Sequence, residues 1–542
     1  MMIRYGLAYV ASLAVLLAQS SPPGPGAVDK LLDEIVKNEQ DFLAQMRVLN
    51  PIMETYLQED PEGPEDGPRD DQYFLGRVNI AGGVDYDSFL DQATLRQRAH
   101  GKQIIFKPAG FAQMMIADAT NFDRQTYSFE FVRREFLGEV RCLLFEVVPR
   151  AENAAGRFIG RIWVEDRERR IVRLNGSFTP AKVSRWSSNV EVYFNFDSWR
   201  VNVAPKRWVP AYVYVENANP ATAKQRVPRF KAQTRFWGYD VGGGDKLSEL
   251  TSILVESESE VADAAGSKQN TPLESQRMWE RQAEENVLER LNKSGLLAPK
   301  GEVDKVLNAV VNNLLATNNL NLDIECRVLM TTPLESFSVG RAIVISRGLI
   351  DVLPDEASLA MVLAGEVAHI ALGHRTETQF AFANRTMLSD TQVLNRFRFR
   401  RPEAEATSAG KKAIEYLKNS PYAEKLSNAG LFLKALAARA PRLPGLIQAN
   451  LGNQLASGET FVQLNELARR APALSEQKME QIAALPLGSR IKADPWSNQL
   501  ALLKTKSVAL LSAREKMPFE VSPFVLHLTR VATPKPIARA GE

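Results

Sequence analysis

The sequence predicts an α+β protein in which an antiparallel β domain is followed by a helix-rich domain. From Phe74 to about Val255, apolar and polar residues alternate in short runs that end at turn residues, which is typical of strands. Beyond about residue 272, apolar residues recur at a spacing of three to four, which is typical of amphipathic helices. The chain of 542 residues also exceeds the size that one hydrophobic core serves, so we expect at least two domains.

The overall composition is that of an ordinary folded protein. Hydrophobic residues make up 45% of the chain and charged residues 24%. The 67 Lys and Arg residues nearly balance the 64 Asp and Glu residues, which leaves a net charge of +3. This balance gives no electrostatic reason to expect a nucleic-acid partner.

The N-terminus has the pattern of a secretory signal peptide. Arg4 precedes an apolar run over residues 7–18, and Ala18-Gln19-Ser20 places small residues at the cleavage-defining positions. The run is shorter than the roughly 18–20 apolar residues that a membrane span needs. No cysteine follows it, which argues against a lipid-anchored lipoprotein. We therefore expect residues 1–20 to be cleaved and the protein to be exported to the periplasm or outside the cell.

We expect the β domain to span residues 28–255, with a helix before its strands. Apolar residues at three-to-four spacing predict a helix over about residues 28–58, and an acidic stretch with Pro and Gly predicts a loop over 59–71. Alternation predicts strands at 158–164, 171–174, 190–196 and 211–215, the first two joined by a polar turn at 165–168. Strands that follow one another in this way form an antiparallel meander, so we expect a curved sheet or a half-open barrel.

The hairpin from Gly160 to Arg173 resembles the repeating unit of lipoprotein-carrier domains of the LolA/LolB type. The resemblance implies an incomplete barrel around a helix, with a lipid or acyl chain as the partner held in its concavity. A β-rich interaction or structural domain is the alternative interpretation of the same pattern.

A polar stretch over residues 256–272 has no apolar periodicity and is predicted to be a linker. We expect a second domain over residues 273–512 and a C-terminal tail over 513–542. Apolar stripes predict helices near 287–297 and 303–315, and a strand is predicted at 326–330. Residues 336–346 predict a hairpin that turns at Gly340, and Asp355 is a plausible N-cap for a long helix that follows a helical turn at 347–350.

The long helix carries the strongest chemical signal, Gly365-Glu366-Val-Ala-His369. In the H-E-x-x-H pattern, two histidines four residues apart bind Zn²⁺, and the glutamate beside the first activates water. Glu366 and His369 have the required spacing, whereas Gly365 has no side chain where the first histidine would stand. A buried polar pair without any function is the plain alternative for Glu366 and His369.

The order of strand, hairpin, Arg347-Gly-Leu-Ile350, acidic cap and this helix resembles metallopeptidase family 48 over about residues 280–500. The resemblance implies a zincin-like metallopeptidase domain. It implies that Glu366 is the general base, that His369 is a zinc ligand and that Glu405 is the later third ligand, with Glu403 as the alternative. Thr407 departs from the family's aspartate in this later segment. An edge strand that binds extended substrate is also implied, at Phe337, Ser338 and Val339.

Gly365 decides between the functional hypotheses. A catalytic zinc site normally has three protein ligands, and His369 with Glu405 supplies two, so we expect zinc to be bound weakly or not at all. Proton transfer by Glu366 alone is typically worth only about 10²–10⁴-fold. His374 is predicted to lie about 140° around the helix from His369, too far to replace the missing ligand.

The favoured hypothesis is a non-catalytic domain that binds polypeptide or an envelope partner. An active zinc metalloendopeptidase that uses Glu366, His369 and Glu405 is the alternative, and a lipid or lipoprotein carrier is a second one. Two cysteines, Cys142 and Cys326, fall in different predicted domains, and either an interdomain disulfide or two buried thiols is compatible with the sequence.

Overall fold

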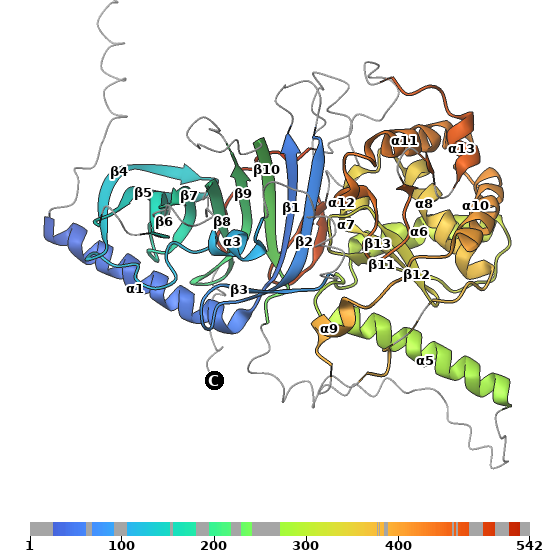
Figure 1. Cartoon of the computed structure of the whole chain (residues 1–542), viewed down its shortest axis with the longest axis horizontal. Coiled ribbons are helices and arrows are strands. Elements are labelled where there is room, and N and C mark those ends of the chain that lie inside the picture. The colour runs from blue at the N-terminus through green and yellow to red at the C-terminus, as the bar shows by residue number, and fades with distance from the viewer. Residues whose placement is uncertain are drawn as a thin grey trace, which may run out of the picture.

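A large antiparallel sheet and a helical half lie side by side in the computed structural model (Figure 1). The structure describes residues 25–60, 68–90, 106–151, 155–179, 194–217, 229–240, 271–376, 378, 380–383, 388–457, 460–461, 464–475, 491–503 and 520–531. The two halves confirm the predicted α+β fold class. None of the described helices combines the length and the apolar character needed to cross a bilayer.

The N-terminal half is built on one ten-stranded sheet in which all neighbouring strands are antiparallel, in the order β3-β2-β1-β10-β9-β8-β7-β6-β5-β4. The strands are β1 (Ile52–Asp60), β2 (Asp70–Asn79), β3 (Asp85–Ser88), β4 (Tyr127–Leu137), β5 (Val140–Pro149), β6 (Phe158–Glu165), β7 (Ile171–Phe178), β8 (Asn195–Ala204), β9 (Arg207–Glu216) and β10 (Arg229–Trp237). Helices α1 (Pro25–Leu49) and α3 (Pro108–Gln113) accompany the sheet.

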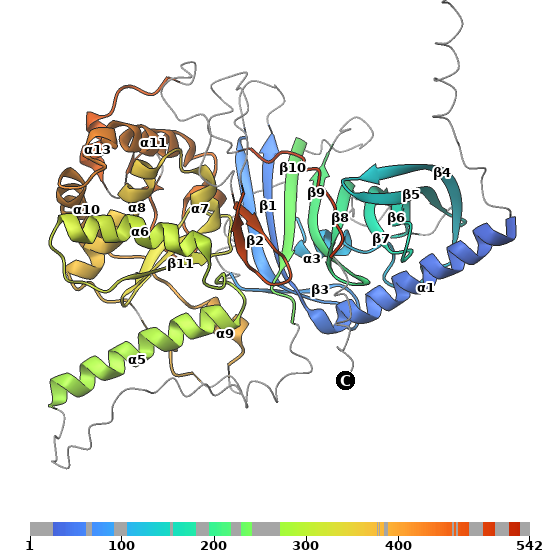
Figure 2. The ribbon, with the colours of Figure 1, turned by 180° about the vertical axis from the view of Figure 1, so that it is seen from behind.

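Helix α1 packs its apolar side against one face of the sheet, where its residues share a hydrophobic core with residues of most of the strands (Figures 1 and 2). Ile35 and Met46 are fully buried there. Glu39 of α1 also forms a bidentate ion pair with Arg200 of β8, at 2.6 and 2.7 Å. Apolar burial and this ion pair together fix the helix on the sheet.

The predicted helix over 28–58 is too long, because α1 ends at Leu49 and residues 52–60 form β1. The error has a physical cause. Nearly every residue of β1 is buried, on both faces of the sheet, so the strand lacks the alternation that marks a half-exposed strand. Of the predicted loop at 59–71, residues 61–67 lie outside the described residues. The strands predicted at 158–164, 171–174 and 211–215 are confirmed, whereas β8 begins only at Asn195 and residues 190–193 lie outside the described residues.

Helices surround a small three-stranded sheet in the C-terminal half. The order of this sheet is β11-β13-β12, with β13 parallel to β11 and antiparallel to β12. The predicted hairpin at 336–346 is confirmed, and Gly340 adopts a φ of +58° at its turn. The helices and strands of the C-terminal half are α5 (Pro272–Lys293), α6 (Glu302–Thr317), β11 (Glu325–Leu329), β12 (Ser336–Val339), β13 (Ala342–Ser346), α7 (Arg347–Val352), α8 (Glu356–Ala371), α9 (Asp390–Leu394), α10 (Glu403–Lys418), α11 (Leu426–Arg439), α12 (Pro444–Ile447), β14 (Ala456–Ser457), β15 (Thr460–Phe461), α13 (Asn465–Arg470), β16 (Ile491–Ala493) and β17 (Leu500–Leu502).

The two halves meet at β1 and β2. Met53 and Leu57 belong to the core beneath α1, whereas Ile52 and Tyr56 belong to the core of the C-terminal half, so alternate residues of β1 serve different cores. Two buried carboxylates cross the junction. Glu54 accepts a 2.7 Å hydrogen bond from the Thr332 hydroxyl, and Asp71 accepts hydrogen bonds from two backbone N–H groups of α12.

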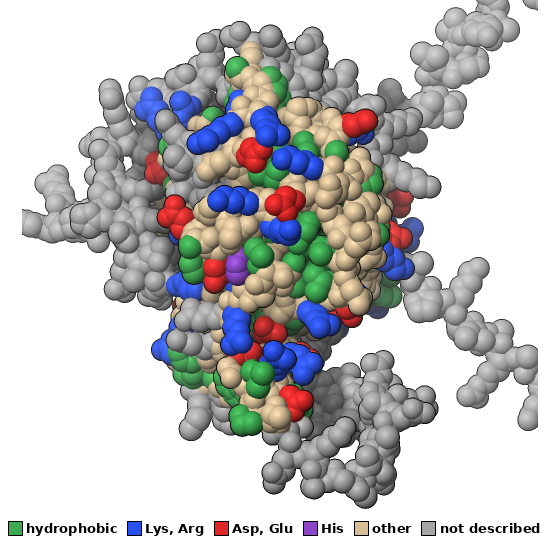
Figure 3. Space-filling view, turned by 90° about the vertical axis from the view of Figure 1, so that its right-hand side faces the viewer, with side chains coloured by type: hydrophobic (Ala, Val, Ile, Leu, Met, Phe, Trp, Pro, Cys, Tyr) green, Lys and Arg blue, Asp and Glu red, His purple; other side chains and the backbone are tan. Residues whose placement is uncertain are grey.

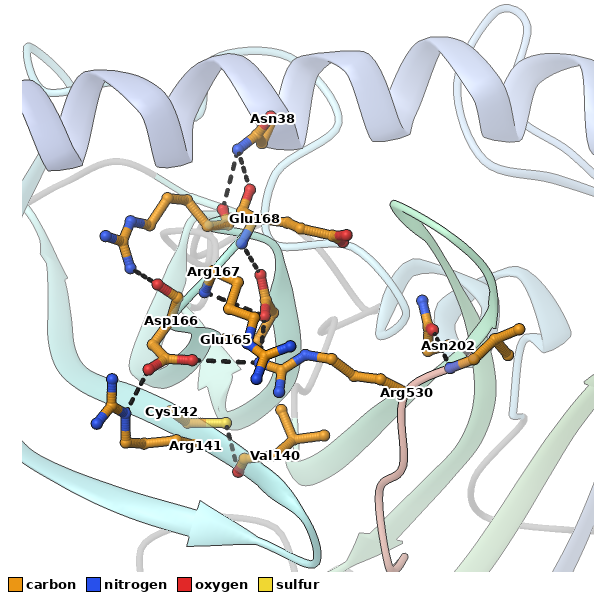
Figure 4. A network of polar contacts seen from close by, with 12 residues as sticks. Asn38, Val140, Arg141, Cys142, Glu165, Asp166, Arg167, Glu168, Asn202 and Arg530 are labelled. Atoms are coloured by element: carbon orange, nitrogen blue, oxygen red, sulfur yellow. Dashed lines mark hydrogen bonds and ion pairs between the residues drawn. The ribbon is translucent and has the colours of Figure 1, made fainter. Parts of the chain in front are cut away.

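Residues 520–531 return from the C-terminal half to the N-terminal sheet. Figure 4 shows Arg530 reaching Glu165 and Asp166 at the end of β6, at 2.6 and 3.2 Å. Leu528 is buried, and its carbonyl accepts a 2.8 Å hydrogen bond from the Glu139 N–H. Residues 1–20 and 256–270, which carry the predicted signal peptide and most of the predicted linker, lie outside the described residues.

Cys142 and Cys326 are separate buried thiols, so they do not form the disulfide that the sequence left open. Burial raises the pKa of each thiol to about 12. A buried thiol with so high a pKa is chemically inert.

Candidate functional site

Helix α8 lies at the centre of the C-terminal half. Its residues 357–369 are all buried, and it packs against α6, α10, α11 and β12. A helix that is apolar all round belongs in a core rather than at a surface. The predicted cap is confirmed, because Asp355 accepts hydrogen bonds from the backbone and the hydroxyl of Ser358, at 2.8 and 2.7 Å.

Glu366 points from α8 toward the start of β12. Its Oε1 accepts a 2.8 Å hydrogen bond from the Ser336 hydroxyl and a 3.1 Å hydrogen bond from the Asn453 amide. The other carboxylate oxygen, Oε2, is buried and has no hydrogen-bond partner among the described residues. Burial raises the pKa of Glu366 above its ordinary value, because the charged form is poorly solvated there.

His369 and His374 lie together, and the prediction that His374 faces elsewhere was wrong. Their Nδ1 atoms are 2.9 Å apart. Helix α8 ends at Ala371, and Gly373 adopts the left-handed conformation with a φ of +69°. The His374 N–H bonds the His369 carbonyl and the Gly373 N–H bonds the Ile370 carbonyl, both at 3.0 Å. This is the Schellman arrangement of a helix C-terminus, which turns the chain back over the last helical turn.

Glu405 completes a cluster with the two histidines. It lies in the first turn of α10, which packs along α8. One ligand atom from each of His369, His374 and Glu405 lies within 4.8 Å of the other two. The alternative ligand, Glu403, is exposed and is not part of this cluster. The structure therefore brings together His369 and Glu405 as the sequence predicted, and it adds His374.

The cluster has the donor types of a transition-metal site. His369 is fully buried, and its Nε2 has no hydrogen-bond partner within the described part of the chain. The same is true of Glu405 Oε2. Burial, the Arg401 charge and His374 lower the pKa of His369 to about 3, so its imidazole is neutral, the form that binds metals. Two imidazoles and one carboxylate suit zinc.

A buried arginine lies beside this cluster. The Arg401 guanidinium donates to the Ser338 carbonyl at 3.3 Å and to the Thr376 hydroxyl at 3.1 Å. Burial lowers the pKa of Arg401, and the nearby charges of Glu366, Glu405 and Glu284 oppose that effect. Arg401 thus supplies positive charge close to Glu405, the carboxylate of the cluster, and to Glu366.

The outer edge of β12 is covered by the chain itself. Asn453 pairs with Ser336 as an antiparallel bridge, and its N–H donates to the Ser336 carbonyl at 2.8 Å. The Ser338 carbonyl accepts hydrogen bonds from Thr376, at 2.8 Å, and from Arg401. The predicted substrate-binding residues are buried, with exposures of 0%, 1% and 0% for Phe337, Ser338 and Val339. Their role in binding substrate stays a prediction.

His374, Arg401 and Asn453 were not anticipated as parts of this site. Gly373 was a usable signal for His374, because glycine is the usual residue at the left-handed position that ends a helix. No local signal places Asn453, because 87 residues separate it from Glu366. His374 is partly exposed. The face of the C-terminal half that Figure 3 shows carries interspersed basic and acidic side chains, and a histidine is visible on it.

Comparison with known proteins gives one family match and several distant structural likenesses. A LolA superfamily protein from Nitrosomonas europaea is 11% identical, with a TM-score of 0.21, and the match covers 38% of this chain and 90% of that chain. A domain from Vibrio parahaemolyticus named for outer membrane lipoprotein sorting is 13% identical, with a TM-score of 0.21, covering 40% and 97%. The MucA/MucB complex of Pseudomonas aeruginosa is 10% identical, with a TM-score of 0.14, covering 40% and 95%. At these TM-scores the likenesses do not define the fold of this chain.

No curated protein matches the sequence. The model of peptidase family M48 matches residues 302–428. This range begins with α6 and ends in α11, and it contains Glu366, both histidines of the cluster and Glu405. The C-terminal half of this chain is therefore similar to peptidase family M48 over these residues.

Proposed function

We propose that this chain is an exported protein whose M48 domain binds extended polypeptide without hydrolysing it. The observation that carries this proposal is the state of Glu366. Its carboxylate is held by Ser336 and Asn453, and the residue directly before it, Gly365, offers no metal ligand. A general base must reach the proton that it removes, and one oxygen of Glu366 is already engaged.

Strand β12 supports the binding part of the proposal. Ser336 and Ser338 turn their carbonyls to the side of β12 away from β13, where both accept hydrogen bonds from the chain's own residues. The isolated antiparallel bridge between Asn453 and Ser336 supports this, because a residue of the chain already pairs with this edge. A polypeptide that adds to an exposed sheet edge gains the same main-chain hydrogen bonds. We infer that such a ligand replaces residues 451–453 at β12.

A metal-dependent peptidase is the second candidate, and a specific observation favours it. His369, His374 and Glu405 offer three ligand atoms, the number found in catalytic zinc sites. Glu366 Oε2 also has no partner among the described residues and could accept a proton. In this alternative a bound zinc ion would polarise the scissile carbonyl, while His369, His374 and Glu405 hold the ion and Glu366 accepts the proton.

Hydrolysis of an unfolded substrate separates the two candidates. Purified wild-type protein and Glu366→Gln are incubated with casein in the presence of zinc, with and without a chelator, beside a zinc endopeptidase of known activity. We expect wild type and Glu366→Gln to leave casein equally intact. Cleavage by wild type that is abolished both by the chelator and by Glu366→Gln would establish the peptidase instead.

Export and lipid binding are further parts of this proposal that rest on the sequence. Residues 1–20 have the signal-peptide pattern, which supports a periplasmic or extracellular location. An acyl chain held on the α1 face of the N-terminal sheet would compete with side chains of α1, because these already fill the core there. Lipid binding at this domain therefore requires α1 to move, and acyl chains that co-purify with the protein are the evidence that would support it.

A further inference from the structure

His369, His374 and Glu405 meet the physical requirements of a ligand site independently of any hydrolytic activity. Their three ligand atoms lie within 4.8 Å of one another. His369 Nε2 and Glu405 Oε2 are both buried, and neither has a hydrogen-bond partner among the described residues. A buried polar atom without a partner costs free energy, and a metal ion bound by these residues would satisfy both atoms.

The donor set selects a class of cation. Two imidazole nitrogens and one carboxylate oxygen suit Zn²⁺ and chemically similar divalent transition metals. Mg²⁺ and Ca²⁺ prefer ligand sets made of oxygen atoms. Three protein ligands also leave one position of a tetrahedral zinc ion free for a solvent molecule or another ligand.

His374 supplies the donor that Gly365 cannot supply. The H-E-x-x-H arrangement takes both nitrogen ligands from within one helix. In this chain only His369 lies inside α8, and the second imidazole comes from beyond the helix end, where Gly373 turns the chain back. The two hydrogen bonds of this turn fix the backbone of His374, and Ser408 of α10 lies 3.5 Å from its Nε2. His374 is therefore positioned before any metal arrives, which lowers the entropic cost of binding.

Charges around the site set how tightly it would bind a cation. Arg401 is buried nearby and repels a positive ion. Glu366 and Glu284 lie near Arg401 and offset part of its charge. We therefore expect this site to bind a metal ion more weakly than a zinc site that has no neighbouring cation. We also expect the affinity for the ion to fall when any one of the three ligands is removed.

We propose that this chain binds one divalent transition-metal ion through His369, His374 and Glu405, with His374 replacing the ligand absent at Gly365. The ion joins the end of α8 to the start of α10, two elements that otherwise meet mainly through apolar packing. This proposal goes beyond polypeptide binding and does not depend on it.

Metal content and spectra test the proposal without any assay of activity. The full-length protein is stripped with a chelator, dialysed, and titrated with Zn²⁺ by calorimetry and with Co²⁺ by visible absorption. We expect one equivalent of either ion to bind, with Co²⁺ bands that report mixed nitrogen and oxygen ligands and a rise in Tm with Zn²⁺. The proposal would be overturned if the protein bound less than about 0.2 equivalents of Zn²⁺ or Co²⁺ even at the highest metal concentration that keeps it in solution, because a one-to-one site approaches one equivalent there.

Single substitutions assign the ligands. Loss of a group that merely supports a metal ligand typically costs about 10- to 100-fold in affinity, so His374→Ala and Glu405→Gln should each weaken Zn²⁺ binding at least that much. His527→Ala removes an exposed histidine outside the cluster and should leave the affinity unchanged. His374 is partly exposed, so His374→Ala should fold, and an unchanged circular dichroism spectrum checks this. Equal affinities of His374→Ala and wild type would overturn the role of His374.

The outcome is distinguishable from a failure of the proposed function. Stoichiometric zinc without casein cleavage supports both proposals. Zinc binding with chelator-sensitive cleavage supports the metal site and overturns the non-hydrolytic function. No zinc and no cleavage overturns the metal site and leaves the proposed function in place.

Discussion

At the scale of single residues, the buried ion pair between Glu39 and Arg200 predicts a large effect of one substitution. Both side chains are almost fully buried, at 1% and 2% exposure, and Arg200 also donates to the Met115 carbonyl at 3.1 Å. Glu39→Ala leaves the Arg200 charge buried without its partner. We expect the free energy of unfolding to fall by about 3–5 kcal/mol, measured by urea denaturation monitored by circular dichroism.

An exposed ion pair provides the matched control. Glu289 pairs with Lys293 on α5, and both side chains are about half exposed. Glu289→Ala should produce no measurable loss, because exposed pairs are solvated and screened. Equal losses from Glu39→Ala and Glu289→Ala would contradict the importance of burial at Arg200.

The candidate site was only partly predictable from residues. The spacing of Glu366 and His369 on a helix follows directly from the sequence, and the structure places Glu405 beside His369 as expected. His374 was rejected because the helix was assumed to continue through it. The three-dimensional position of a residue beyond a helix end depends on the capping turn, and Gly373 determines that turn here.

At the scale of secondary-structure elements, the edge of β12 predicts that Gly452 controls access to it. A Cβ atom added at Gly452 would lie 2.6 Å from the Ser336 carbonyl oxygen and 2.7 Å from the Phe337 ring. Gly452→Ala should push residues 451–453 away from β12, at an overpacking cost of about 1–3 kcal/mol. A shift of that size changes an equilibrium by about 5- to 150-fold, so labelled unfolded casein should bind more tightly in a fluorescence anisotropy titration.

Gly110→Ala is the matched control, because a Cβ atom added there has nothing within 4 Å. It should bind casein as wild type does. Unchanged binding by Gly452→Ala, with a lowered Tm that proves local strain, would argue against β12 as the polypeptide site.

Elements marked by a half-exposed pattern, a cap or an obligatory turn were predictable, whereas the buried strand β1, which has none of these signals, was not. The hairpin of β12 and β13 follows from Gly340, whose φ of +58° few other residues adopt. Strand β1 was assigned to a helix because burial on both faces leaves it without alternation. Its two-sided burial is a consequence of the second domain, which local sequence does not contain.

At the scale of the whole molecule, the docking of the two halves could not be derived from sequence patterns. The contacts join residues hundreds of positions apart, such as Asp71 with Gly445 and Gln58 with Val521. In both contacts the donor is a backbone N–H group, which every residue except proline has. The identity of the donor residue therefore gives no sequence signal that predicts the contact. The returning segment 520–531 also binds the N-terminal sheet, and we therefore expect the two halves to stabilise each other.

The buried carboxylate of Asp71 makes this junction sensitive to pH. Its oxygens accept hydrogen bonds from the N–H groups of Gly445 and Leu446, at 2.6 and 2.8 Å, and from the Tyr56 hydroxyl at 3.0 Å. Burial raises the pKa of Asp71 from its ordinary value to about 7 in spite of these bonds. The folded state then holds the proton more tightly than the unfolded state, so the stabilisation is present at low pH and is lost as pH rises through about 7.

We therefore expect the protein to be more stable at pH 5 than at pH 8, with Asp71 contributing at most about 1.4 kcal/mol per pH unit. Urea denaturation at both pH values measures the difference, and hydrogen exchange at Gly445 and Leu446 reports whether the junction opens. Asp71→Asn keeps a hydrogen-bond acceptor but cannot titrate, so it should reduce the difference, whereas Asp41→Asn at an exposed position of α1 should not. If Asp71→Asn and wild type lose the same stability between pH 5 and pH 8, the pH dependence arises elsewhere than at this junction.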